Sequence, residues 1–537
     1  MSSRHLLFRS EARAKVLRGA SALNDAVRVT LGPKSRCVLI EKKWGAPVVC
    51  NDGVTVAREV ELQDPEENLG ARMMRQAAEK TGDVVGDGTS TATLLAHALF
   101  AEGLKNVVAG ASAVDVKRGL ERGLRAALEA IRALSRPVTT RRERVQVATV
   151  SAHNDAAIGQ LVADAVERVG PNGVITLEEA RGTETTLEVV EGMQFDRGYL
   201  SPYFVTDEGR MECVLEDALL LLHDGRIAGM KDLVSLLEQL VQQGRPLLVV
   251  AEEVEGEALA TLVLNKLRGV LPCAAVKAPG FGDRRRAMLE DIALITGGRL
   301  VSAESGRALE HVRMEDLGRA RRAVVGRDAT TLVGGQGDKG RISARVEQLR
   351  QQSRDARSDY DREKLDERVA HLAGGVAVLR VGAPSEAELK SRKEAFDDAV
   401  HATRAAAAEG VVPGCGLAYL RALDAVAREE AQSEGDEQVG LRVLRHALEA
   451  PTRQIAENSG VDGGVVVEHM RAGKGAYGFD AARNTWVDLV EAGIIDPTRV
   501  VRTALENAVS VAGVLLLTEA TLTETPEPRG EQAPQAM

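Results

Sequence analysis

The middle of this chain follows a different pattern from its two ends, and that contrast constrains the fold more than any other feature. Between residues 185 and 305, strand-like apolar runs alternate with helical runs. The strand-like runs lie at 218–224, 246–253 and 273–279, and the helical runs at 231–243, 255–269 and 283–297. This alternation is typical of a parallel α/β domain. Residues 65–135 and the chain from 411 onward instead show helical periodicity, so we expect the two ends to form one helical domain with an α/β domain inserted between them.

The composition argues against several classes of protein. The 537 residues contain 69 Lys and Arg against 79 Asp and Glu, a net charge of 69 − 79 = −10, which disfavours binding to nucleic acid or to an anionic membrane. No apolar run approaches the roughly 18 residues that a membrane helix needs. The five cysteines are scattered, which excludes a disulfide framework, and the lack of an H-E-x-x-H motif makes a zinc site unexpected. The first residues resemble neither a secretory signal nor an acid-poor transit leader, so we expect a cytoplasmic protein.

A glycine-rich turn leads directly into an apolar helix. Its residues are Gly86-Asp87-Gly88-Thr89-Ser90-Thr91. Glycines let backbone amides approach an anion, hydroxyls can bind phosphate oxygens, and a helix N-terminus adds about half a positive charge. Asp87 is then a candidate Mg²⁺ ligand, because Mg²⁺ bridges carboxylates and phosphates. Taken alone, the motif is more simply read as a loop with a helix N-cap.

The other phosphate-binding motifs are missing or weak. No Walker A motif occurs, and the single G-x-G-x-x-G match, at 335–340, lies between a half-polar run and a heavily charged helical pattern. That match is read as a surface loop, because a dinucleotide fingerprint needs a buried strand before it. Residues 38–58 predict short strands around tight turns, one of them at Asn51-Asp52-Gly53.

Several longer stretches become specific when they are taken in order. They are VTLGPK (29–34), GAPVVCNDGVTVAREVEL (45–62), GDGTSTAT (86–93), VKAPGFGDRRRAMLEDIA (276–293) and HATRAAAAEGVVPG (401–414). In these stretches the chain resembles the group I chaperonin large subunit, the GroEL family, and the resemblance extends from about residue 4 to residue 522. Chance matching over stretches of this length is negligible.

The resemblance implies a multidomain fold and a set of partners. The fold has a mainly α-helical equatorial ATPase domain (1–135 and 411–522), a small α+β intermediate domain (136–190 and 375–410) and an α/β apical domain (191–374) inserted between the chain halves. A disordered tail follows at 523–537. The implied partners are non-native polypeptides, a GroES-type co-chaperonin lid and further copies of the chain in a heptameric ring, usually as two stacked rings. Neither nucleic acid nor a membrane is implied.

The resemblance also carries over a nucleotide site, residue by residue. Asp52 and Asp398 would be catalytic and orient the attacking water, Asp87 would hold Mg²⁺, and K⁺ would be a second ion. Asp398 falls on a helix of the intermediate domain, so its approach to ATP would require that domain to close. The implied ATP-binding residues are Thr30, Leu31, Gly32, Pro33, Asn51, Asp87, Gly88, Thr89, Ser90, Thr91, Gly414, Cys415, Asp480, Ala481, Ala482 and Asp496, with Gly53, Ser151 and Ile494 beside them.

A client- and lid-binding face is implied on the apical domain. Its residues are Tyr199, Tyr203, Phe204, Val234, Leu237, Leu259, Val263 and Leu264. The helical spacing of the aliphatic residues predicts a stripe, but spacing alone fits a stripe that faces the core equally well. The resemblance favours an exposed apolar groove instead.

Two departures from the family keep a second function open. Cys415 stands where the family has glycine, and the chain ends PRGEQAPQAM rather than in a glycine-methionine repeat. The first hypothesis is an ATP-driven chaperone that folds proteins in a lid-closed chamber. The alternative is a specialised paralogue that acts as a holdase or scaffold with weak ATP turnover. A metabolic nucleotide enzyme is remote, because the chain has neither a Walker A motif nor a kinase lysine-aspartate set.

Overall fold

The computed structural model describes residues 4–42, 47–170, 173–180, 182–231, 233–302, 309–356 and 358–524. The chain divides into two compact units, of which the first combines both ends (1–163 and 383–537) and the second is residues 164–382. The predicted fold class is confirmed, because a mainly helical unit built from the chain ends accompanies an inserted α/β unit. The predicted intermediate domain falls partly in each unit, so the division into three domains stays a prediction.

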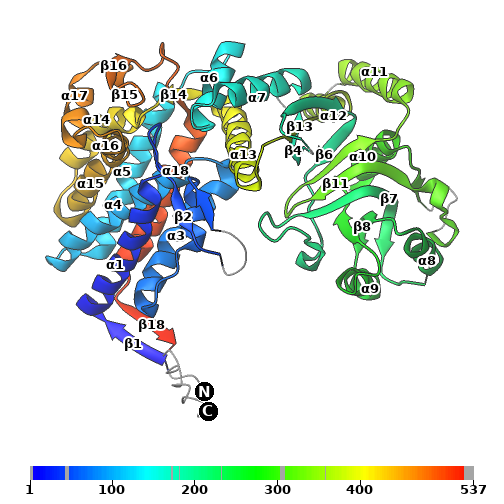
Figure 1. The fold of residues 1–537 in the computed structure, drawn as a ribbon, viewed down its shortest axis with the longest axis horizontal. Helices are drawn as coiled ribbons and strands as arrows, with labels where there is room; N and C mark the ends of the chain where they lie inside the picture. The colour runs from blue at the N-terminus through cyan, green and yellow to red at the C-terminus, as the bar shows by residue number, and fades with distance from the viewer. Residues whose placement is uncertain are drawn as a thin grey trace. The chain divides into compact units, whose positions relative to one another are not determined.

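The first unit is a helical bundle with four small two-stranded sheets (Figure 1). Its helices are α1 (Arg9–Arg28), α2 (Gly53–Glu59), α3 (Pro65–Val85), α4 (Thr89–Val108), α5 (Ala113–Leu134), α6 (Arg141–Ser151), α13 (Glu386–Glu409), α14 (Leu417–Ala431), α15 (Gly435–Ala447), α16 (Ala450–Asn458), α17 (Gly463–Ala472) and α18 (Thr498–Leu516), and α7 (Ala156–Val169) crosses the boundary between the units. The antiparallel strand pairs are β1 (Arg4–Phe8) with β18 (Ala520–Glu524), β2 (Val38–Ile40) with β3 (Val48–Cys50), β14 (Val411–Pro413) with β17 (Ile495–Pro497), and β15 (Tyr477–Asp480) with β16 (Thr485–Asp488).

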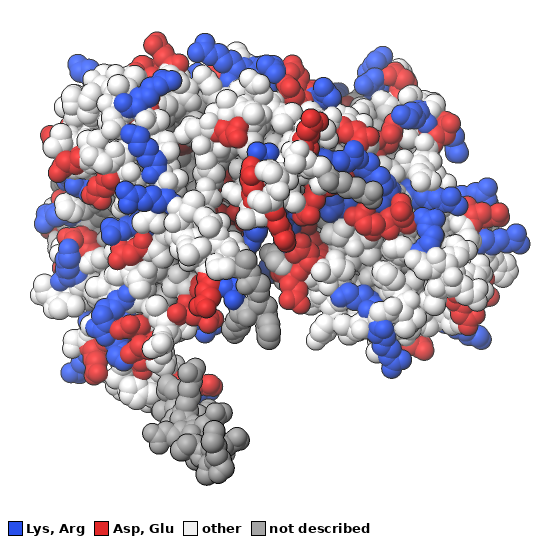
Figure 2. Space-filling model, in the orientation of Figure 1, with Lys and Arg blue, Asp and Glu red and all other residues white. Residues whose placement is uncertain are grey.

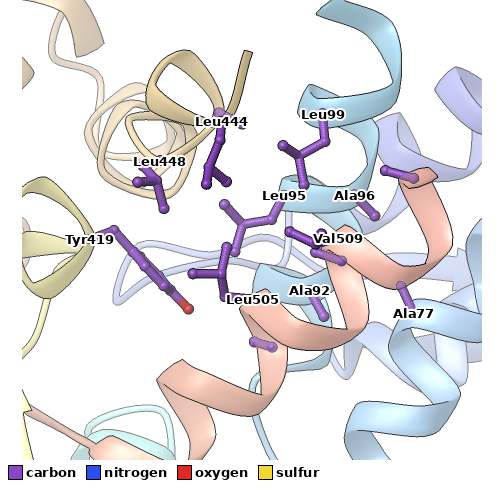
Figure 3. Close-up of a cluster of buried hydrophobic side chains, with 14 of the residues drawn as sticks. Ala77, Ala92, Leu95, Ala96, Leu99, Tyr419, Leu444, Leu448, Leu505 and Val509 are labelled. Atoms are coloured by element: carbon purple, nitrogen blue, oxygen red, sulfur yellow. The ribbon is translucent and has the colours of Figure 1, made fainter. Parts of the chain in front are cut away.

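The bundle core joins residues that are far apart in the sequence. Leu95 and Leu99 of α4 pack with Leu505 of α18 and Tyr419 of α14 (Figure 3). The buried Tyr419 hydroxyl donates a hydrogen bond of 2.8 Å to the carbonyl of Val501, so this polar group keeps a partner in the core. The core therefore ties the N-terminal helices to the C-terminal ones, as the shared helical periodicity predicts.

Local signals fix where α3 and α4 end and begin. Asp64 caps α3 by accepting hydrogen bonds from the amides of Glu66 and Glu67, with Pro65 at the first turn. Gly86 ends α3 in the left-handed conformation, with φ 70°, and Gly88 precedes α4 with φ 79°. The short connection between these glycines leaves Asp87 at the N-terminus of α4.

The second unit is built around a seven-stranded mixed sheet in the order β6-β12-β11-β7-β8-β9, with β10 also paired to β7. Its strands are β6 (Gly192–Phe195), β7 (Cys213–Ile227), β8 (Leu247–Val254), β9 (Cys273–Lys277), β10 (Leu300–Val301), β11 (Gly318–Val325) and β12 (Thr330–Gly335). Its helices are α8 (Val234–Gln243), α9 (Gly256–Leu267), α10 (Gly282–Thr296), α11 (Lys339–Asp355) and α12 (Asp359–Ala373). A separate three-stranded sheet has the order β4 (Val174–Glu179), β13 (Val376–Val381), β5 (Thr186–Val190).

The predicted parallel arrangement holds for part of this sheet, and the other part is antiparallel. Strands β7, β8 and β9 are parallel and separated by helices, as predicted. Strands β11, β12 and β6 add to the other side in antiparallel pairs. The reason lies in the connections, because β11 and β12 are joined by a short turn, and a parallel pair needs a long crossover.

The prediction of a disordered tail starts two residues too early. Thr523 and Glu524 belong to β18, where they pair with His5 and Arg4 of β1. The rest of the predicted tail, 525–537, lies outside the described residues.

None of the described helices combines the length and the apolarity that a membrane crossing requires. On the face in view, basic and acidic side chains are interspersed (Figure 2).

Gly70 allows α1 and α3 to pack closely, which leads to the first prediction. A Cβ atom added to Gly70 of α3 would lie 2.2 Å from the carbonyl oxygen of Val16 in α1, whereas one added to Gly82 meets nothing nearer than 3.5 Å. We expect Gly70→Ala to lower the free energy of unfolding by about 1–3 kcal/mol through overpacking. The matched change Gly82→Ala, on the same helix, should raise it by up to about 1 kcal/mol. Urea midpoints followed by circular dichroism test this pair, and equal midpoints would contradict the packing argument.

Candidate functional site

A cavity of about 240 Å³ in the first unit gathers nearly all of the predicted nucleotide residues. Its wall comes from both ends of the chain. The N-terminal half contributes the loops after α1, before α2 and between α3 and α4, together with the end of α6. The C-terminal half contributes segments of α13, α14, α16, β15, β17 and α18. The predicted residues in the wall are Thr30, Leu31, Gly32, Pro33, Asn51, Asp52, Gly53, Asp87, Gly88, Thr89, Ser90, Thr91, Ser151, Asp398, Cys415, Asp480, Ala481, Ala482, Ile494 and Asp496. Gly414 does not line the cavity, although a Cβ atom there would lie 3.2 Å from Asp496 Oδ1.

One end of the cavity has the geometry of an anion site. The N-terminus of α4 opens toward it through Gly88, Thr89 and Ser90. Space is tight at Gly88, where a Cβ atom would lie 2.6 Å from Val500 Cγ1. The hydroxyl groups of Thr30 and Ser90 lie 2.9 Å apart and share a hydrogen bond, which links the loop after α1 to this helix end. Free backbone amides and the helix dipole at such an end stabilise negative charge.

Three carboxylates face the same cavity and repel one another. Burial raises the pKa of Asp87, although its oxygens accept hydrogen bonds from the Gly88 amide (2.5 Å) and the Ser151 hydroxyl (2.9 Å). Burial also raises the pKa of Asp398 well above its usual range, and the charges of Asp87 and Asp52 raise it further. Among the described residues, no Lys or Arg lines the cavity. The unbalanced negative charge therefore favours binding of a cation.

A divalent cation with phosphate groups fits this donor set. In the described part of the chain, no three His, Cys, Asp or Glu side chains are grouped so that they could hold a metal ion by themselves. A cation beside Asp87 would therefore complete its shell with ligand and water oxygens, which is how Mg²⁺ is commonly bound with nucleotides.

The cavity wall also carries Asp496, Asp480 and Cys415. Burial, together with the charge of Asp87, raises the pKa of Asp496 to about 7. Asp480 is buried and caps its own turn, because its Oδ1 accepts hydrogen bonds from the amides of Ala482 (2.9 Å) and Arg483 (3.2 Å). Cys415 has a φ of 54°, and burial raises the pKa of its thiol to about 12, so the thiol stays protonated near neutral pH.

Comparison with known proteins identifies the family of this chain. The family model described as the TCP-1/cpn60 chaperonin family matches residues 23–526. The chain is also similar to a curated protein, Chaperonin GroEL 5 of Bradyrhizobium diazoefficiens, with 64% identity over 535 residues that cover 100% of this chain and 99% of that protein. The chain belongs to the TCP-1/cpn60 chaperonin family. It is a group I chaperonin of the GroEL type, and such chaperonins are ATPases.

The cavity of this chaperonin includes residues that the sequence analysis missed. Most are apolar or small and belong to helices or strands, so no motif separates them from ordinary core residues. They are Val150, His153, Asn154, Gly416, Tyr419, Pro451, Ile455, Phe479, Pro497, Val500, Val501 and Ala504. Apart from Gly416, whose φ is 73°, the residues of this set with positive φ are His153 (52°) and Asn154 (67°). A polar pair with that backbone just after Ser151 is the only local signal in this set.

Asp398 has a different position from the one expected. The family resemblance implies a position outside the nucleotide pocket until a domain closes. Instead, the chaperonin's α13 already presents Asp398 in the cavity wall, and α13 belongs to the same compact unit as Asp52 and Asp87. Any domain movement that brings it closer to ATP stays a proposal.

The predicted client-binding residues of the chaperonin divide into three groups. Tyr203, Val234 and Leu264 are exposed, with 63%, 46% and 46% of their surface accessible. Tyr199, Leu259 and Val263 are partly buried against the core of the second unit. Phe204 (0% exposed) and Leu237 (8%) belong to that core, so the prediction that they lie on an open surface is wrong. Both pack inward because α8 and the turn at 202–204 cover the sheet.

The raised pKa of Asp496 gives a prediction about pH. Its value of about 7 exceeds the ordinary 3.8, so the folded state holds more protons than the unfolded state between those pH values. The stability that this proton contributes is present at low pH and is lost as the pH rises through about 7. We expect the urea midpoint to fall from about pH 5 to about pH 8, and the fall to be smaller in Asp496→Asn. Parallel midpoint curves for the two proteins would contradict the assignment.

Proposed function

We propose that this ATP-dependent chaperone captures non-native polypeptides on an apolar face of its second unit and folds them in a chamber closed by a GroES-type lid. ATP binding and hydrolysis in the cavity of the first unit would drive the cycle. The observation that carries the proposal is the convergence of Asp52, Asp87 and Asp398 on one cavity at the N-terminus of α4. We also propose a cytoplasmic location.

The carboxylates have distinct roles in the proposed hydrolysis. Asp87, held by Gly88 and Ser151, would hold Mg²⁺, which when bound would supply positive charge beside the phosphates. Asp398 orients the attacking water and accepts its proton, as its raised pKa favours. Oxygen from that water bonds to the γ-phosphorus as the bond to the β–γ bridging oxygen breaks, which yields ADP and phosphate. Asp52 assists in orienting the water, Asp496 binds the ribose, and K⁺ is a second ion.

The exposed part of the predicted client face supports the binding proposal. Val234 begins α8, Leu264 lies on α9, and Tyr203 lies in the short 3-10 turn at 202–204. Exposed apolar side chains of this size mark surfaces that bind other apolar groups. The non-native chain and then the lid would bind to these same residues.

Substitution of this face tests the capture step. We expect Val234→Ser combined with Leu264→Ser to bind denatured protein at least about tenfold more weakly, because two apolar side chains leave the contact. ATP hydrolysis should be unchanged. The matched control is Val241→Ser, an exposed apolar residue of the same α8 outside the predicted face. Equal capture of a labelled denatured enzyme by all three proteins would contradict the proposed face.

Exposed apolar strands in the first unit support assembly into a ring. The sheets β1–β18 and β2–β3 have only two strands each and present Phe8 (58% exposed), Leu39 (70%) and further apolar side chains at Leu6, Val49 and Leu522. Free sheet edges of this kind pair readily with another chain. We propose that copies of the chain assemble through them into a heptameric ring, stacked in pairs. Sedimentation velocity tests this, and a monomer at micromolar concentration would contradict it.

A further inference from the structure

Helix α16 touches two separate turns of the nucleotide cavity. Near its start, the Thr452 hydroxyl donates a hydrogen bond of 2.9 Å to the carbonyl of Cys415, in the turn before α14. At its end, the Asn458 amide donates to the carbonyls of Arg28 (2.9 Å), the last residue of α1, and of Leu31 (2.8 Å), in the loop that follows. Both turns line the cavity, whereas neither Thr452 nor Asn458 does.

The orientation of the Asn458 amide is determined by its neighbours. Both atoms that face its nitrogen are backbone carbonyl oxygens, which can only accept hydrogen bonds. Its oxygen accepts a hydrogen bond of 2.9 Å from the side-chain nitrogen of Gln454, one turn earlier on α16. Asn458 is therefore engaged on both sides, and the amide cannot be reversed without loss of these bonds.

Apolar contact adds to the hydrogen bonds along the same helix face. Ile455 lies three residues from both Thr452 and Asn458, so the three side chains share one side of α16. A Cβ atom on Gly32, whose φ is 91°, would lie 3.2 Å from Ile455 Cγ2. The loop at Thr30–Pro33 thus rests on this face of α16 and has no sheet of its own to hold it.

We propose that α16 is a brace that holds both turns in the conformation that binds nucleotide. Asn458 and Thr452 are positioning residues: they act through the backbone of other residues and do not touch the ligand. The inference rests on the proposed function only in taking this cavity as the nucleotide site. It assigns part of the binding energy to a helix that carries no recognised nucleotide motif.

The isosteric change Asn458→Asp tests the brace most directly. It replaces the side-chain NH2 group, which donates both hydrogen bonds, with an oxygen that faces two carbonyl oxygens. Because these oxygens repel one another, the loop should move away from α16. We expect the Kd for MgADP, measured by isothermal titration calorimetry on the assembled protein, to rise about tenfold or more. The kcat for ATP at saturation should stay within about twofold of the unchanged protein, because the reacting groups remain in place. Glu457→Gln, an exposed neighbour on α16, is the matched control and should change neither value.

A second pair of variants, both at Thr452, tests the proposal if Asn458→Asp does not fold. Thr452→Val keeps the shape of the side chain and removes the hydroxyl, whereas Thr452→Ser keeps the hydroxyl. We expect a severalfold higher Kd for Thr452→Val and a value near the original for Thr452→Ser. Equal Kd values for folded Asn458→Asp and the unchanged protein, or for the two Thr452 variants, would overturn the brace. Failure of the unchanged protein itself to bind MgADP would instead overturn the assignment of the cavity.

Discussion

Asp398→Ala is expected to bind ATP and hydrolyse it at least about 100-fold more slowly than the unchanged chaperonin. General base catalysis by a positioned side chain contributes about 10²–10⁴-fold, and burial, with the charges of Asp87 and Asp52, raises the pKa of Asp398 well above its usual range, which suits that role. Binding should persist because the α4 N-terminus and Asp87 are untouched. The measurement combines steady-state phosphate release with the Kd for MgATP.

A neighbouring residue gives the control for this prediction. Asp397 precedes Asp398 on α13, but its side chain is half exposed and does not line the cavity. Asp397→Ala should hydrolyse ATP at close to the original rate. If Asp398→Ala kept more than about one tenth of the original turnover, Asp398 would not be the group that activates water.

Asp87→Asn is expected to affect activity and stability in opposite directions. Loss of the carboxylate removes the proposed Mg²⁺ ligand, so turnover should fall by about 10²–10³-fold, and the Mg²⁺ concentration for half-maximal rate should rise. The nucleotide-free protein should unfold at a higher temperature, because a neutral amide avoids the cost of burying a charge, which raises the pKa of Asp87, and no longer repels Asp398.

Ser151→Ala provides a graded comparison for Asp87. It removes one of the two hydrogen bonds that hold the carboxylate, the 2.9 Å bond from the hydroxyl, and leaves the charge. We expect a reduction in turnover of about tenfold or less, without the increase in thermal stability. A melting temperature of Asp87→Asn below that of the unchanged protein would contradict the argument that the charge of Asp87 destabilises the nucleotide-free protein.

The sequence predicts the polar part of the cavity well, because turns leave local signals. Gly86 and Gly88 need positive φ, and the carboxyl group of Asp87 between them and the hydroxyl groups that follow have a clear use in an Mg²⁺–phosphate site. Ile455 and Phe479 could not be found in this way, because an apolar residue that lines a cavity is indistinguishable in sequence from one that fills a core. Asp398 depends on the family resemblance alone, since nothing in a helix such as α13 marks one acidic residue as lining a cavity.

The errors in the fold prediction have the same origin. Phe204 and Leu237 follow a pattern that fits either a surface stripe or a core stripe, and the packing of the second unit decides for the core. Residues 38–58 predict short strands around tight turns, yet α2 begins at Gly53. There Asp52 caps the helix by accepting hydrogen bonds from the amides of Val54 and Thr55. A short helix with a good cap outweighs the strand preference of its β-branched residues.

The most direct test of the whole account is the refolding yield of a denatured, aggregation-prone enzyme. The purified chaperonin would be assayed with and without ATP and a GroES-type lid, with Asp398→Ala in parallel. The account predicts that recovery of enzyme activity needs both ATP and the lid, and that Asp398→Ala does not sustain repeated rounds. Suppressed aggregation without any recovery that depends on ATP and the lid would contradict it, and would identify the protein as a holdase.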